Sequence, residues 1–193
     1  LTSLLHDIST LNRMDDAPEM TSTENVNISQ MVQNIQKETA LQLQQKGMTF
    51  VNRLPDNIVV RGNQSLLYSV FRNLTDNAIN YAGEDRTVML RQTLAGGKVR
   101  IDVIDHGEGI PPESLPYVWD RYYKVDKNHK RTTVGAGLGL SIVKGVLEAH
   151  GAEYGVESTP GRGSDFWFCL PCLKGSFDET KAPESDEKSF DFS

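Results

Sequence analysis

Apolar residues recur three and four positions apart in four segments, and they alternate with polar residues in six shorter ones. The first spacing predicts helices and the second predicts strands. The expected helices are residues 1–16, 26–45, 64–81 and 138–150, and the expected strands are 48–54, 57–61, 87–94, 98–105, 153–158 and 164–170. This mixed order predicts an α+β two-layer sandwich, in which helices cover one face of a mixed, mainly antiparallel sheet.

Polar residues and glycines mark where several of these elements begin and end. Asn63 is a suitable N-cap for the helix over 64–81, and Gly151 is a suitable C′ residue after the last helix. A turn at Pro55-Asp56-Asn57 separates the first two strands. The following four strands form two expected hairpins, one across AGGK and one across TPGRG.

Composition and charge narrow the class of protein. Of the 193 residues, 38% are apolar and 24% are charged, which is typical of a globular chain. The net charge of −6 argues against a general nucleic-acid binder. No apolar run approaches the ~20 residues needed to span a bilayer. Because the chain has no initiator Met, we expect it to be a fragment of a longer protein.

The two cysteines, Cys169 and Cys172, form a CxxC pair. Such a pair can be a redox centre, or half of the ligand set of a structural zinc site. The surrounding segment SDFWFCLPC is typical of a terminal strand and not of a strand-to-helix turn. We therefore favour strand residues in a reducing cytoplasm.

The helix over 64–81 carries two amides on neighbouring turns, Asn73 and Asn77. On a helical wheel Asn77 falls within the apolar arc, and a buried amide is costly unless it is paired. Asn77 is then either a core residue bonded to backbone, or an oxygen ligand offered to a Mg²⁺ that carries phosphates.

Asp105 ends an alternating strand and is followed at once by Gly107 and Gly109. Glycines allow a tight turn and a close approach of backbone to a flat ligand. The carboxylate can accept a hydrogen bond from an exocyclic amine such as that of adenine. The alternative is an ordinary Asp-Gly turn.

Residues 118–140 combine cations with glycines. The cations are Arg121, Lys124, Lys127, Lys130 and Arg131. They indicate either a solvated loop or a mobile lid whose charges meet triphosphate oxygens. Gly135, Gly137 and Gly139 then lead into a helix N-terminus, which is a natural anion site. The segment lacks the Lys-Ser/Thr of a P-loop, and no strand precedes it as a dinucleotide fingerprint requires.

The order and spacing of these segments resemble the sensor histidine kinases. Asn73–Asn77 resembles their N box, Asp105-x-Gly107-x-Gly109 the G1 box, WDRYYKVD the F box, Gly135-x-Gly137-x-Gly139 the G2 box, and TPGRGSDFWF the final glycine box. The resemblance covers about residues 24–171. It implies the Bergerat ATP-binding fold, which gyrase, MutL and related ATPases share.

The resemblance implies ATP and Mg²⁺ as ligands and assigns roles to residues. Asn77 would hold Mg²⁺ with Asn73 supporting it, Asp105 would bind the adenine amine, and Gly107 and Gly109 would shape that pocket. Tyr81 would pack near adenine, Arg121 and Lys124 would approach the phosphates, and Gly135, Gly137, Leu138 and Gly139 would close the lid. The remaining expected nucleotide-binding residues are Asn80, Ile110, Tyr122, Leu140 and Ser164.

Three positions qualify the resemblance. Gyrase-like ATPases have a Glu as general base where Asn73 stands, and an amide cannot take that proton. The chain therefore looks built to hold ATP without rapid hydrolysis, which suits transfer to a protein imidazole. Asn80 stands where many relatives have Lys, so one phosphate contact is in doubt. Tyr122 replaces the commoner Phe, and we expect this change to be tolerated.

The phosphoacceptor is expected upstream of residue 1. His6 is followed by an acid, but only about 20 residues separate it from the ATP-binding domain, too few for the rest of a dimerisation hairpin. Neither His106 nor His129 is assigned the role. The implied organisation is the end of the second hairpin helix (1–16), a linker (17–25), a catalytic ATP-binding domain (26–172) and a disordered acidic tail (173–193).

The resemblance also implies partners and a location. The partners are ATP or ADP, the protein's own dimerisation and histidine phosphotransfer domain, and a response regulator, with a homodimer in the full-length protein and no nucleic acid. This domain would be cytoplasmic, and the full-length protein would lie in the bacterial inner membrane. The alternatives are an ATPase or serine-directed anti-sigma kinase of the same fold, and a nucleotide-binding or pseudokinase module that signals by contact alone.

Overall fold

The computed structural model describes residues 22–123 and 137–173. The expectations for residues 1–16, for Lys124 and Gly135, and for the tail beyond Leu173 lie outside these ranges. In chain order the elements are β1 (Glu24–Asn27), α2 (Ile28–Lys46), β2 (Thr49–Asn52), β3 (Val59–Gly62), α3 (Gln64–Tyr81), β4 (Thr87–Ala95), β5 (Lys98–Asp105), the 3₁₀ turn η2 (Leu115–Tyr117), α4 (Gly139–Ala149), β6 (Glu153–Thr159) and β7 (Gly163–Pro171).

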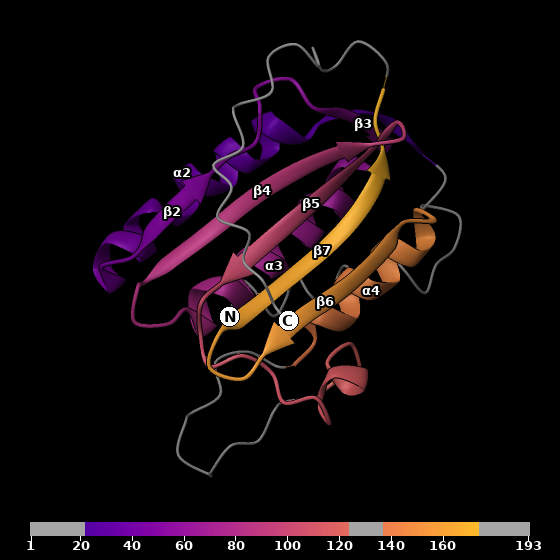
Figure 1. The fold of residues 1–193 in the computed structure, drawn as a ribbon. Coiled ribbons are helices and arrows are strands. Elements are labelled where there is room, and N and C mark those ends of the chain that lie inside the picture. Colours follow the sequence, from indigo (N-terminus) through magenta and orange to yellow (C-terminus); the bar gives the residue numbers. More distant parts are fainter. Residues whose placement is uncertain (1–21, 124–136, 174–193) are drawn as a thin grey trace.

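Five strands form the main sheet in the order β2-β4-β5-β7-β6. The pairings β4–β5, β5–β7 and β6–β7 are antiparallel, and only β2 runs parallel to its neighbour β4. Figure 1 shows α2, α3 and α4 together behind this sheet. The predicted two-layer α+β sandwich with helices on one face is therefore confirmed, and both expected hairpins are present.

The strands on either side of the Pro55–Asn57 turn belong to different sheets. β2 joins the main sheet, whereas β3 pairs with the short strand β1. The sequence pattern did not predict β1. Their apolar residues Val26 and Val60 lie opposite each other and are buried. Because Val26 is held in this pair, α2 begins at Ile28 and not at Val26. A four-residue strand offers too little alternation to be recognised in the sequence.

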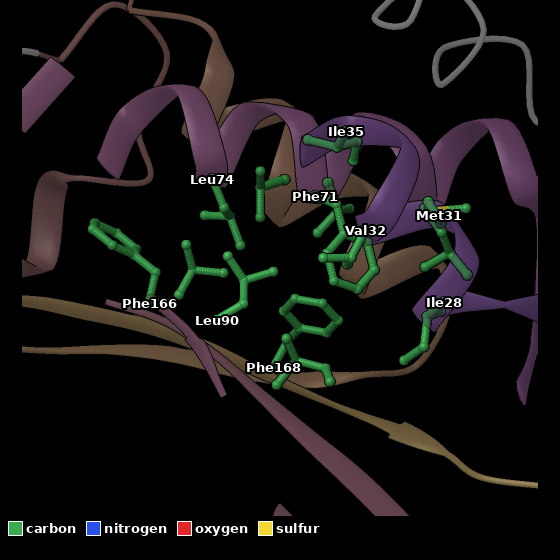
Figure 2. Packing of buried hydrophobic residues seen from close by; sticks show 14 of the residues in the cluster. Ile28, Met31, Val32, Ile35, Phe71, Leu74, Leu90, Phe166 and Phe168 are labelled. Atoms are coloured by element: carbon green, nitrogen blue, oxygen red, sulfur yellow. The ribbon is translucent and has the colours of Figure 1, made fainter. Parts of the chain in front are cut away.

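The core between sheet and helices fixes the position of α3 over β7. Figure 2 shows side chains of α2 and α3, among them Phe71, packed against side chains of the strands, among them Phe168 of β7. The rings of these two residues meet edge to face with centroids 5.3 Å apart, and both are fully buried. Burying one such side chain contributes about 1.5–3 kcal/mol.

The expected helix boundaries follow from local capping. Asn63 Oδ1 accepts the Leu66 amide at 3.1 Å at the start of α3. After α4, Gly151 has a φ of +62°, and the Ala152 amide donates to the Leu147 carbonyl at 2.9 Å, as a Schellman motif requires. Within residues 22–123 and 137–173, no helix has the length and apolarity to cross a membrane.

Candidate functional site

Asp105, the last residue of β5, is 2% exposed. One carboxylate oxygen accepts the Gly107 amide at 2.9 Å, and the Ser164 backbone also donates to this side chain. Burial raises the pKa of Asp105 to about 6, and the backbone hydrogen bonds oppose that rise. The carboxylate is thus held in one orientation by backbone donors, with acceptor capacity left for a ligand.

The two glycines after Asp105 are required by close packing. A Cβ on Gly107 would overlap the Tyr81 carbonyl oxygen at the end of α3. Gly109 has a φ of +67°, and a Cβ there would overlap the Thr159 carbonyl oxygen. The loop after β5 is therefore clamped between the end of α3 and the β6–β7 turn, and both contacts need a residue without a side chain.

Ser158 ties this loop to the β6–β7 turn, and sequence reasoning did not identify it. Its Oγ accepts the Ile110 amide at 2.8 Å, donates to the Gly163 carbonyl at 2.7 Å, and lies 3.1 Å from Ser164 Oγ. Its partners Ile110 and Ser164, both expected nucleotide-binding residues, are buried. A hydroxyl residue shortly before a Pro-Gly turn was the only signal in the sequence, and it is too common to be specific.

Four polar residues lie along α3, namely Asn73, Asn77, Asn80 and Tyr81, and together they form the α3 row. Asn73 and Asn77 are half-buried, whereas Asn80 and Tyr81 are exposed. At one end of the row the Asn73 amide donates to the Ser69 carbonyl at 2.9 Å, and its Oδ1 would lie 2.7 Å from a Cβ on Gly139. The row therefore extends from the start of α4 to the loop that holds Asp105.

Asn77 lies at the edge of the buried face of α3 and not within the core. Its side chain has no hydrogen-bond partner among the described residues. A half-exposed amide oxygen without a protein partner fits a Mg²⁺ ligand whose remaining positions are filled by phosphates and water. In the described part of the chain no group of three or more His, Cys, Asp or Glu residues could hold a metal ion.

The flanks of the glycine-rich segment lie together. The Tyr122 amide donates to the Gly137 carbonyl at 2.9 Å. Tyr122 itself has a φ of +64° and is 71% exposed, and Arg121 is exposed beside it. Trp119 anchors this region through edge-to-face contacts with Tyr154 and Phe166, at 5.0 and 5.6 Å between centroids.

At the start of α4, Leu138 is buried and Leu140 is half-buried. Lys124 and Gly135 lie outside the described residues. The structure thus brings Asp105, Gly107 and Tyr81 together at one end of the α3 row, and Asn73 and Gly139 at the other. Cys169 lies on β7 and Cys172 just after it, away from these residues in the chain; neither forms a disulfide, and the Cys172 thiol donates to the Val59 carbonyl.

Comparison with known proteins gives one family match and many relatives. Residues 62–174 match the family described as histidine kinase-, DNA gyrase B-, and HSP90-like ATPase. The sensor-like histidine kinase SenX3 of Mycobacterium tuberculosis is 31% identical over 95% of this chain and 45% of its own length. The phosphate regulon sensor protein PhoR of Haemophilus influenzae is 34% identical over 75% of this chain and 34% of its own length.

Solved structures share the fold. Full-length ShkA in complex with AMPPNP has a TM-score of 0.73 and 26% identity, over 89% of this chain and 35% of that one. The mycobacterial sensor histidine kinase MprB has a TM-score of 0.67 and 24% identity, over 78% of this chain and 98% of that one, and shows the fold alone. The chain spans about half the length, or less, of the curated relatives it matches.

Proposed function

The chain belongs to the histidine kinase-, DNA gyrase B- and HSP90-like ATPase family and contains the ATP-binding catalytic domain of the histidine kinase type; from this premise we propose that the whole protein is a sensor histidine kinase. It would transfer the γ-phosphoryl group of ATP to a histidine of its dimerisation domain. The phosphoryl group would then pass to an aspartate of a response regulator. Asn73 favours a kinase over an ATPase, because its side-chain amide donates to the Ser69 carbonyl and an amide cannot act as general base.

Different residues along and beside the α3 row would bind the adenine, the Mg²⁺ and the phosphates of the nucleotide. Asp105, oriented by Gly107 and Ser164, accepts the exocyclic amine of adenine. Asn77 is the protein ligand of Mg²⁺, which neutralises phosphate charge when bound. The start of α4, next to Asn73, offers backbone N–H groups to the phosphates. Arg121, with Lys124 beyond the described range, would approach the same phosphates.

The same proposal covers the partners, the location and the division of the chain. The full-length protein would be a homodimer through the hairpin whose last helix ends within residues 1–16, and it would be anchored in the bacterial plasma membrane with this domain in the cytoplasm. Residues 17–25 would link the hairpin to the catalytic domain over 26–172. The curated relatives support this assignment, because they are named as sensor kinases and extend well beyond this chain.

The test is the melting temperature with and without Mg²⁺-ATP, for wild type, Asp105→Asn and the exposed control Asp56→Asn. At 100 times the Kd, a ligand of the folded state adds about 2.7 kcal/mol, or about 5–10 °C for a chain of this size. We expect this shift in wild type and Asp56→Asn, and its loss in Asp105→Asn. The shift is compared within each variant, because removing a buried charge changes the melting temperature by itself.

Two outcomes would favour a function other than histidine phosphorylation. No shift in wild type at millimolar nucleotide would favour the pseudokinase alternative. Rapid release of inorganic phosphate from ATP would favour an ATPase and would contradict the role given to Asn73. Transfer of label from ATP to a supplied dimerisation hairpin, stable in base and labile in acid, would support histidine phosphorylation directly.

A further inference from the structure

The α3 row of polar residues meets a cation at the end opposite to α4. Lys46, the last residue of α2, donates its ammonium to Asn80 Oδ1 at 3.3 Å. These two residues are 34 positions apart in the sequence, so no local pattern joins them. The contact places a positive charge beside Asn80, which is the position where the resemblance left a phosphate contact in doubt.

The end of α2 is held firmly in this place. Gly47 caps the helix with a φ of +61°, and its amide donates to the Gln44 and Leu43 carbonyls. Arg86, just before β4, donates from Nη1 to the Lys46 carbonyl at 3.3 Å, and its own carbonyl accepts the Thr49 amide at 2.8 Å. The backbone of Lys46 is therefore fixed against the connection between α3 and β4.

The charge of Lys46 is available to a ligand. Its side chain is exposed and forms no salt bridge within 4.0 Å among the described residues. Asp76, one turn before Asn80 on α3, is paired with Arg72 at 3.0 Å. Burial raises the pKa of Asp76, and the charges of Arg72 and Lys46 oppose that rise, but the Lys46 and Asp76 side chains form no pair within 4.0 Å. Asn80 presents its carbonyl oxygen to the ammonium and thereby steers it toward the α3 row.

We propose that Lys46 binds the phosphates of the nucleotide and that Asn80 positions it. This inference rests on the proposed function, and it names a residue of α2 as part of that site. The order of the residues along the α3 row indicates which phosphates Lys46 would bind. The Asn73 end lies at the start of α4, whereas the Tyr81 end contacts the Gly107 loop that carries Asp105. Lys46 therefore faces the phosphates nearest the ribose, and it acts on a diphosphate as well as on a triphosphate.

The experiment measures the Kd of Mg²⁺-ATP, Mg²⁺-ADP and adenosine by calorimetry for four proteins. These are wild type, Lys46→Met, the matched control Lys37→Met and the double variant Lys46→Met with Asn80→Lys. Lys37 is also exposed and on α2, nine positions earlier. Partly exposed charge pairs are worth little, so we expect Lys46→Met to weaken ATP and ADP by about two- to fivefold.

Three further results are expected if Lys46 acts through phosphate charge. Adenosine affinity stays unchanged in Lys46→Met, Lys37→Met binds all three ligands like wild type, and Asn80→Lys restores ATP and ADP binding to Lys46→Met. The loss should also shrink at high salt, because the contact is screened.

Each opposite result overturns the inference. ATP and ADP binding unchanged in Lys46→Met, in a wild type that binds both, would refute it and leave the proposed function intact. An equal loss for adenosine would mean that the change disturbs the pocket and not a phosphate contact. A wild type that binds no nucleotide would refute the proposed function and this inference together.

Discussion

Replacing Ser158 with Ala removes one hydroxyl that joins two turns of the candidate site. The Ile110 amide loses its acceptor and the Gly163 carbonyl loses its donor. Asp105 precedes the first of these turns, and Ser164, whose backbone donates to Asp105, follows the second. The substitution therefore tests whether a residue that need not touch the nucleotide holds the adenine pocket together.

The expected magnitude follows from the groups left without partners. A buried polar group that loses its hydrogen bond costs about 1–3 kcal/mol. Two groups lose a partner here, but Ser158 is half-buried, so water can replace part of what is lost. We expect the free energy of unfolding to fall by about 2 kcal/mol, which lowers the melting temperature by about 4–8 °C. Nucleotide binding must then also order the loop, and we expect Mg²⁺-ATP affinity to fall about three- to tenfold.

Urea unfolding and calorimetric titration with Mg²⁺-ATP measure the two effects. Ser158→Thr keeps the hydroxyl on a strand and is expected to behave like wild type. Ser65→Ala removes an exposed hydroxyl on α3 and controls for the loss of a serine as such. If Ser158→Ala unfolds within about 0.5 kcal/mol of wild type and binds ATP equally well, the hydroxyl does not tie the two turns and the reasoning fails.

Two further predictions concern stability away from this loop. Burial, and then the negative charge of Asp102, raise the pKa of Asp165 to about 7, although the Arg91 and Arg100 guanidinium groups, at 3.6 and 3.8 Å from its carboxylate, oppose the rise. The folded protein thus holds the proton more tightly than the unfolded chain, and the stability this gives at low pH is lost as the pH rises through about 7. Asp165→Asn should therefore raise the free energy of unfolding at about pH 8 and flatten its decline from about pH 5, measured by urea unfolding, whereas parallel pH profiles would contradict this. His150 Nε2 accepts the backbone N–H of Asn63 at 3.1 Å, and His150 Nδ1 lies 2.7 Å from the Val146 carbonyl oxygen. His150→Phe should therefore lower the free energy of unfolding by about 1–3 kcal/mol, measured by urea unfolding. Unchanged stability would show that this hydrogen bond between the end of α4 and the start of α3 contributes nothing.

The sequence by itself determined that α3 and α4 are helices, where α3 begins and where α4 ends. The apolar spacing of α3, its Asn63 cap and the Gly151 end of α4 are local signals, because each depends on residues within about one helical turn. The Asp105-x-Gly107-x-Gly109 spacing likewise singled out a strand end that the fold does bury. Its role with adenine stays a prediction.

Only the tertiary structure decided which distant elements meet. The pairing of β1 with β3, the parallel neighbour of β2, the Ser158 tie and the Lys46–Asn80 contact all join segments whose own sequences look ordinary. Their partners are selected by how the helices and the sheet bury a common core, and not by local propensity. A contact such as Lys46–Asn80 exists because packing brings the end of α2 beside the end of α3, which no spacing along the chain encodes.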